Sequence, residues 1–207
     1  MRKCWRIVAG LGLGIGMAAV PSLTEAHFVL MEPSTTLVQN QLGDPQKLGP
    51  CGGTSANKGI ATGTISRVRG GAPLHLTIRE TIFHPGHYRV ALAVNSVNEF
   101  PPDPEAATRP SDRGPWSVSA PIQNPVQVPV LADGLFPHMS RPTELFQADV
   151  MIPNITCKKC TLQVTQFMAE HGVNPDGGFY YHHCADLAIT ADPAKPVDSA
   201  WPKDLAQ

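Results

Sequence analysis

Apolar residues of this chain recur mostly in short runs that alternate with polar residues, and turn-forming Pro and Gly residues separate the runs. A period of two is typical of β-strands, whereas the three-to-four-residue spacing of helices is scarce. We therefore predict an all-β sandwich. The expected strands are 27–31, 64–69, 74–81, 87–94, 126–131, 143–152, 161–167 and 180–190.

Three long segments lack this alternation and are expected to be irregular loops: 34–62, the proline-rich 95–120 and 168–178. Unstructured loops longer than about 15 residues are uncommon in compact domains and are often functional. The chain is again proline-rich after residue 192, and the tail 193–207 is too short for a second domain. We predict one domain over 27–192, followed by this tail.

The last expected strand places chemistry-bearing residues on its core face. Leu187 is apolar and marks that face, and a period of two puts Tyr181 and His183 on the same side. Both side chains would then lie at the rim end of the core face, where they can take part in a functional site. Alternatively, Tyr181 is a packed aromatic residue and His183 is a hydrogen-bonded core histidine. His182 lies on the opposite face, where we expect it to be exposed or to pack near Cys184.

Residues 1–26 have the features of a secretory signal peptide. A basic start precedes an apolar run that is too short to span a bilayer, and small residues lead up to Ala26. Cleavage after Ala26 makes His27 the first residue of an exported protein. A histidine in this position offers one metal ion two nitrogens, its α-amine and its ring Nδ1.

Charge and motifs exclude several classes of function. The leader carries three basic residues and one acidic residue, so cleavage changes the net charge from −1 to −3. A nucleic-acid-binding protein would need a basic face. The motifs of serine hydrolases, zinc peptidases and phosphate-binding loops are absent. We expect a secreted monomer, extracellular or periplasmic, without a nucleic-acid or membrane partner.

The mature sequence retains four cysteines, Cys51, Cys157, Cys160 and Cys184. An even number in an exported chain indicates two disulfides. A redox or zinc role for Cys157 and Cys160 is the alternative, but no second CxxC pair or thioredoxin-like pattern accompanies them. Three pairings are possible. We favour Cys160–Cys184 with Cys51–Cys157, because Cys160 and Cys184 both belong to long expected strands.

The best partner for His27 lies in the stretch Ile82-Phe83-His84-Pro85-Gly86-His87-Tyr88. His84 sits at a Pro-Gly turn between two strands, where its side chain can face a metal at the rim. His87 opens the next strand and competes as the second ligand, and both can instead be loop histidines without a metal. Glu80 can support a ligand or act as an acid or base, or it can be a solvated charge.

Two imidazoles and an amine form an all-nitrogen set, and divalent copper binds such sites most tightly among first-row metals. The α-amine, with an ordinary pKa of about 8, loses its proton to a metal more readily than a lysine. Zinc would more often recruit a further imidazole, a carboxylate or a thiolate, which His87, His183 or an aspartate can provide. We expect one copper ion.

Together these residues resemble the lytic polysaccharide monooxygenases and related histidine-brace copper proteins. Three matches carry the resemblance, and it spans most of residues 27–190. They are His27-Phe28-Val29-Leu30-x-x-Pro33, His84-x-Gly86-x-Tyr88, and Tyr181 five residues before Asp186. The stretch Cys157-x-x-Cys160-Thr161-Leu162-Gln163-Val164 is also similar to a cysteine-rich strand of the family.

The resemblance implies an immunoglobulin/fibronectin-III-like β-sandwich with a solvent-exposed copper. His27 would chelate through its amine and ring, His84 would complete a T-shaped brace, and Tyr181 would take the axial side. His183 would be a polar residue beside the ligands, with Glu80 and His87 as further candidates. Such enzymes use an external electron donor and O2 or H2O2 to oxidise a glycosidic carbon at a polysaccharide surface of chitin, cellulose or related β-glucans.

The chain also departs from the catalytic members. Only 57 residues separate His27 from His84, so the usual substrate-surface loop is reduced, and Trp116 is the only mature tryptophan outside the tail. His27-Phe28 with Pro50-Cys51-Gly52-Gly53 also looks like a non-catalytic branch that binds copper for acquisition and usually places a carboxylate among the ligands. A secreted adhesion or carbohydrate-binding sandwich with incidental histidines is a third possibility.

Overall fold

The computed structural model describes residues 27–205, so the predicted leader lies outside the described residues. This part of the chain is built almost entirely of β-strands, as predicted, and none of its helical structure is long and apolar enough to cross a membrane. The elements are β1 (His27–Glu32), β2 (Ile65–Arg69), β3 (Pro73–Ile82), β4 (Gly86–Ala93), the 3-10 helix η1 (Val97–Glu99), β5 (Ala107–Ser111), β6 (Gly114–Ser119), β7 (Val130–His138), β8 (Phe146–Met151), β9 (Cys157–Met168) and β10 (Tyr180–Thr190).

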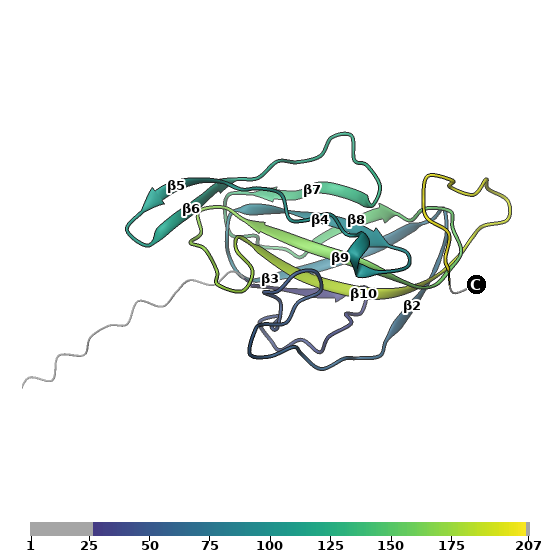
Figure 1. Cartoon of the computed structure of the whole chain (residues 1–207), viewed down its shortest axis with the longest axis horizontal. Coiled ribbons are helices and arrows are strands. Elements are labelled where there is room, and N and C mark those ends of the chain that lie inside the picture. The colour runs from purple at the N-terminus through teal and green to yellow at the C-terminus, as the bar shows by residue number, and fades with distance from the viewer. Residues whose placement is uncertain (1–26, 206–207) are drawn as a thin grey trace, which may run out of the picture.

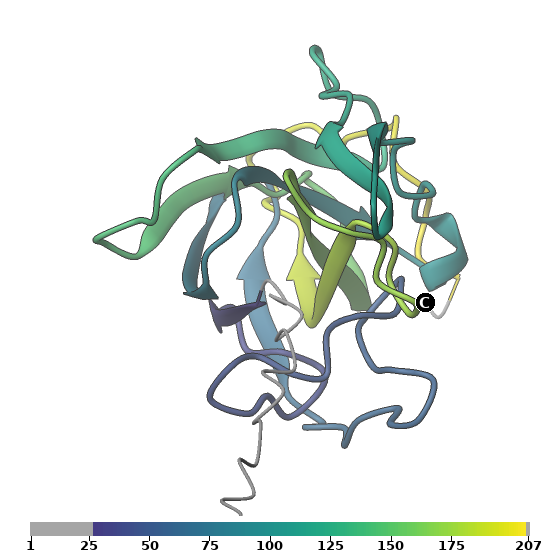
Figure 2. The same ribbon diagram turned by 90° about the vertical axis from the view of Figure 1, so that its left-hand side faces the viewer.

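Two sheets pack face to face and form the predicted sandwich (Figures 1 and 2). The larger sheet has the strand order β2-β10-β9-β4-β7, and the smaller has the order β1-β3-β8. Strand β2 runs parallel to β10, and the other pairs are antiparallel. Strands β5 and β6 form a separate hairpin that projects from one end of the sandwich (Figure 1).

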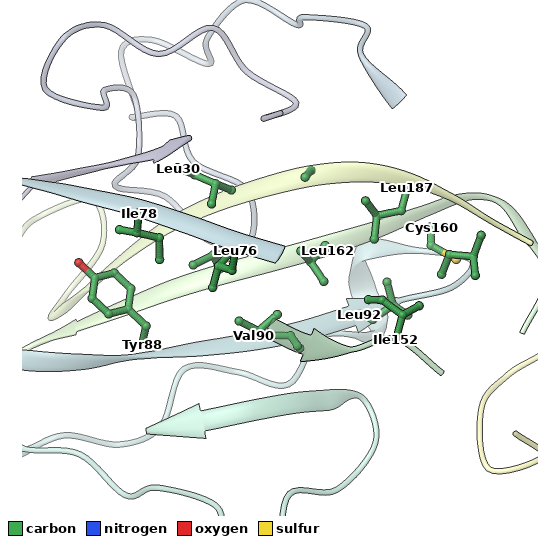
Figure 3. Packing of buried hydrophobic residues seen from close by; sticks show 14 of the residues in the cluster. Leu30, Leu76, Ile78, Tyr88, Val90, Leu92, Ile152, Cys160, Leu162 and Leu187 are labelled. Atoms are coloured by element: carbon green, nitrogen blue, oxygen red, sulfur yellow. The ribbon is translucent and has the colours of Figure 1, made fainter. Parts of the chain in front are cut away.

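The core lies between the two sheets and holds the apolar half of each alternating strand. Each aliphatic or aromatic side chain that is fully buried in this way contributes about 1.5–3 kcal/mol to stability. Figure 3 labels Leu30, Leu76, Ile78, Tyr88, Val90, Leu92, Ile152, Cys160, Leu162 and Leu187 in this layer.

Strand β10 confirms the faces expected from its sequence. Tyr181, His183 and Leu187 are buried on the core side, each with no more than 1% of its surface exposed. His182 on the other face is buried too, instead of exposed, because the loop around Gly49 and the carboxylate of Asp103 cover its ring. Period two identifies the sides of a strand but not what covers the outer one.

The two disulfides exist, but the favoured pairing was wrong. The bonds are Cys51–Cys184 and Cys157–Cys160. In the antiparallel register of β9 and β10, Cys160 lies opposite Leu187 on the core face, whereas Cys184 lies on the outer face three positions away. Two cysteines on opposite faces cannot be bridged. Cys184 is instead linked to the long loop that covers its face.

Two other expectations need correction. The proline-rich loop 95–120 contains the β5–β6 hairpin, and the strand expected at 126–131 lies further along the chain, as β7. The tail is attached to the sandwich: Trp201 packs against the core, and the Asn154 side chain donates hydrogen bonds to backbone carbonyls of Lys195 and Pro196. Short segments that are held by such contacts show little alternation of apolar and polar residues, so the sequence pattern does not reveal them.

Candidate metal centre

Several strand ends meet at one end of the sandwich and gather the predicted metal-binding residues. Strand β1 begins with His27, whose Cα pairs with that of Ile82 at the end of β3. His84 follows two residues later, in the turn to β4. Tyr181 is the second residue of β10, and its ring meets the His27 ring edge-on with centroids 5.4 Å apart. The fold therefore brings His27, His84 and Tyr181 to the same end.

The His27 side chain is buried, and its Nε2 lies 3.0 Å from Oδ2 of Asp44. An ionised carboxylate only accepts hydrogen bonds, so the neutral imidazole carries its proton on Nε2 and its lone pair on Nδ1. Burial alone would raise the pKa of Asp44, but its hydrogen bond to His27, the positive charge of His27 when that imidazole is protonated, and the charge of Lys47 hold that pKa below its ordinary value. Sequence reasoning missed Asp44, because nothing in a polar loop indicates this contact.

His84 is buried as well, and neighbours fix it on two sides. Its backbone N–H donates to Oε1 of Glu80 at 3.4 Å. Its ring meets the ring of His171 edge-on with centroids 4.7 Å apart. His171 donates its Nδ1–H to the Gly172 carbonyl, which orients the imidazole. His171 was not predicted, because it lies in the irregular loop between β9 and β10.

Glu80 is buried rather than solvated, with 1% of its side chain exposed. Its Oε1 accepts hydrogen bonds from Nε2 of His138 at 3.1 Å and from Nε2 of Gln166 at 3.0 Å, in addition to the His84 N–H. Burial alone would lower the pKa of His138, but its hydrogen bonds to Glu80 and to the Phe136 carbonyl raise that pKa above its ordinary value. Glu80 thus anchors the turn that carries His84.

Three buried polar atoms of this network have no hydrogen-bond partner among residues 27–205: Oε2 of Glu80, Oε1 of Gln166 and the Tyr88 hydroxyl. Burial and the charge of Glu80 raise the pKa of Tyr88 well above its ordinary value. Unpaired buried polar atoms cost stability, and native proteins keep only a few of them. Their concentration beside the His84 turn favours a functional role for this end of the sandwich.

Tyr181 is fully buried, as expected of a packed aromatic residue. Its hydroxyl accepts a hydrogen bond from Nδ2 of Asn174 at 3.0 Å. Asn174 is in turn held by two backbone hydrogen bonds to Gly178 in the β9–β10 loop. The hydroxyl end of the Tyr181 side chain is therefore fixed, and its ring packs edge-on against the ring of His27.

His183 and His87 are not brought to the same place. His183 donates from Nε2 to the Phe28 carbonyl at 3.1 Å, and burial lowers its pKa to about 4. It is a neutral core histidine that supports β1. His87 lies on the outer side of β4, where its ring packs against Phe167 and burial lowers its pKa. The rim position therefore belongs to His84.

No known family model matches this sequence, and no curated protein is significantly similar to it. The site has to be interpreted from its own geometry. Among residues 27–205, no group of three or more His, Cys, Asp or Glu side chains is placed to hold a metal ion. A histidine brace needs only two imidazoles, because its third nitrogen is an N-terminal amine. The donors at this end, His27 and His84, fit that requirement.

Proposed function

We propose that this protein is a secreted copper-dependent monooxygenase that oxidatively cleaves glycosidic bonds of β-linked polysaccharides. The α-amine and Nδ1 of His27 and the imidazole of His84 would hold one copper ion. The observation that carries the proposal is the pairing of His27 with Ile82, which lies two residues before His84. If cleavage follows Ala26, the α-amine of His27 would lie beside the turn of His84. The Asp44 contact at Nε2 supports it, because it directs the lone pair of His27 to Nδ1.

The surrounding residues have separable roles in this proposal. A bound copper ion would supply electron transfer from an external donor and activation of O2 or H2O2. Tyr181 would form a wall of the site beside the His27 ring, and Glu80 would hold the His84 turn in place. The β5–β6 hairpin lies next to this end: Ser117 binds the backbone of His171 through its own backbone N–H and its hydroxyl. The hairpin would therefore offer a polysaccharide a surface beside the metal-binding end.

A copper-acquisition protein without turnover is the second candidate, and the surroundings of Trp116 favour it. The indole of Trp116 is not an open platform, because Arg109 lies over its ring at 5.8 Å, Glu170 accepts its N–H, and Gly172 lies against it. Stacking of a sugar on this ring would first require these neighbours to move.

Copper titration tests the brace that both candidates share. Intact mass of the exported protein should give His27 as the first residue. Cu(II) should then bind at one equivalent, and binding should weaken strongly in His84→Ala and in a chain with one extra residue before His27. His75→Ala is the control, because this exposed histidine lies on β3 away from the site. Unchanged copper binding by the extended chain would refute the brace.

Turnover separates the enzyme from the carrier. The copper-loaded protein is incubated with chitin, cellulose and other β-glucans in the presence of ascorbate and H2O2, and the products are analysed by mass spectrometry. Oxidised oligosaccharides that disappear in His84→Ala would support the monooxygenase. Tight copper binding without oxidised products across the panel would favour acquisition.

A further inference from the structure

Asp44 lies in a loop whose shape is fixed by its own side-chain hydrogen bonds. Oδ1 of Asn40 accepts the backbone N–H groups of Leu42, Gly43 and Asp44, each at 2.9 Å. The backbone N–H of Asn40 donates back to the Asp44 carbonyl at 2.9 Å. An Asn that caps several consecutive N–H groups holds a turn in one conformation. Asp44 is therefore the last residue of a turn with a fixed conformation.

The same loop is attached to three strands that surround the metal-binding end. Oε1 of Gln46 accepts the backbone N–H of Phe28 on β1 at 3.1 Å, and the Gln46 carbonyl accepts the N–H of His182 on β10 at 2.7 Å. The Thr81 hydroxyl on β3 donates to the Leu42 carbonyl at 2.7 Å. Gln46 is fully buried. These contacts fix the loop, and with it Asp44, relative to His27.

We propose that Asp44 is a positioning residue for the metal, acting through His27. It keeps the imidazole proton on Nε2, so that Nδ1 presents its lone pair on the side of the α-amine. Metal-binding histidines commonly donate their second ring N–H to a carboxylate, which fixes both the tautomer and the ring orientation. This inference rests on the proposed copper brace, and it assigns to Asp44 the orientation of the His27 imidazole.

The point of contact distinguishes this role from that of a ligand. Asp44 meets Nε2 of His27, whereas the α-amine and Nδ1 are the pair that can close one chelate ring on a metal. A carboxylate bound to Nε2 stands behind the imidazole as seen from that metal. The carboxylate ligand of the copper-acquisition proteins would instead stand on the metal side of the ring.

A second Asp–His pair provides a matched control. Nε2 of His182 lies 2.9 Å from Oδ1 of Asp103, the same chemistry with a similarly half-exposed aspartate. His182 points to the outer face of β10, while Tyr181 and His183 point to the core. Asp103→Ala therefore removes the same kind of hydrogen bond without touching His27.

The first experiment reads the tautomer directly. The copper-free mature protein is labelled with ¹⁵N, and the two ring nitrogens of His27 are assigned by long-range ¹H–¹⁵N correlation at neutral pH. We expect the Nε2–H tautomer in the wild type. Observation of the Nδ1–H tautomer would overturn the inference. This measurement needs neither a variant nor copper, so it decides the point even if Asp44 variants fail to fold.

The second experiment measures Cu(II) affinity by competition with a chelator. Because loss of a carboxylate behind a metal-bound histidine typically weakens metal binding about 10- to 100-fold, Asp44→Ala should show a loss of this size. Asp44→Asn keeps an acceptor oxygen and should lose less than about tenfold. Asp103→Ala should bind as the wild type does.

The outcomes separate this inference from the proposed function. Failure of the wild type to bind copper through its N-terminal amine would refute the brace, whatever the state of His27. Amine-dependent binding that Asp44→Ala leaves unchanged would refute the role of Asp44 alone. An equal, large loss in Asp44→Ala and Asp44→Asn, with a changed EPR spectrum in both, would make Asp44 a ligand instead of a positioning residue.

Discussion

Gly43 passes so close to Phe28 that a Cβ on Gly43 would lie 1.9 Å from the Phe28 carbonyl oxygen. Gly43 also has a φ of +105°, a conformation that residues with a side chain rarely adopt. The contact between Gly43 and Phe28 therefore lies directly beside the contact between Asp44 and His27, because Gly43 precedes Asp44 and Phe28 follows His27. A side chain at position 43 has to push the loop away from this strand.

Gly43→Ala should lower the free energy of unfolding by at least about 2 kcal/mol, because backbone strain and a clash with a backbone atom add. The same displacement should move Asp44 away from His27 and weaken copper binding. Chemical denaturation and copper titration measure the two effects.

Gly114→Ala is the control for backbone strain alone, since Gly114 has a φ of +93° and nothing lies within 4 Å of an added Cβ. We expect it to cost about 1–2 kcal/mol and to leave copper binding intact. Equal losses in the two variants would mean that the Phe28 contact does not constrain the loop.

The two disulfides should differ strongly in their effect on stability. Cys51–Cys184 closes a segment of 133 residues, whereas Cys157–Cys160 closes one of 3. If a disulfide stabilises the fold by lowering the entropy of the unfolded chain, these separations correspond to stabilisations of about 5 and about 1.6 kcal/mol, respectively. Paired Ala variants should therefore show a much larger fall in Tm for Cys51 and Cys184. Similar falls in Tm for both pairs would contradict this order.

Much of the sandwich could be predicted from alternation, because burial of one face leaves a period-two record in the sequence. Strand β10 was predicted with its observed bounds, and Tyr181 and His183 were placed on the correct face. His84 was also recognisable, since a Pro-Gly turn between two alternating runs has to lie at the rim of a sheet. These features depend on local sequence alone.

The residues that were missed depend on contacts between distant segments. Asp44 reaches His27 only because the loop folds against β1, and His171 reaches His84 from an irregular loop. Burial of Glu80 required β7 to bring His138 beside it. Cys184 could not be paired correctly without knowing which loop covers the outer face of β10. A single sequence holds no periodic signal for such contacts.

The exposed pair of His75 on β3 and Asp149 on β8 gives a prediction of pH dependence. Hydrogen bonds to Asp149 and to Gln147 raise the pKa of His75 above its ordinary 6.5. The contribution of this pair to the stability of the fold is therefore fully present below pH 6.5, and it is lost as the pH rises through the raised pKa of His75. An NMR titration should give a His75 midpoint above 6.5. Asp149→Asn should move it back toward 6.5, and an unchanged midpoint would show that the pair does not form in solution.

The ion pair between Glu80 and His138 should be the most strongly coupled pair near the metal-binding end. Both side chains are nearly buried, with 1% and 9% of their surfaces exposed. Removal of one partner leaves the other charge buried, so Glu80→Gln and His138→Gln should each cost about 3 kcal/mol. The double variant should cost clearly less than the two single losses combined, which corresponds to a coupling energy of about 1–3 kcal/mol.

The exposed pair of Lys159 and Asp186 is the reference for this cycle, with 63% of the lysine side chain exposed. Its coupling energy should stay below about 1 kcal/mol, because solvent screens the charges. Glu80→Gln should in addition weaken copper binding, since Glu80 also accepts the backbone N–H of His84. Lys159→Gln should not. A coupling energy for Glu80 and His138 no larger than that of the surface pair would show that the two do not form a buried ion pair, and the anchoring of the His84 turn would then need another explanation.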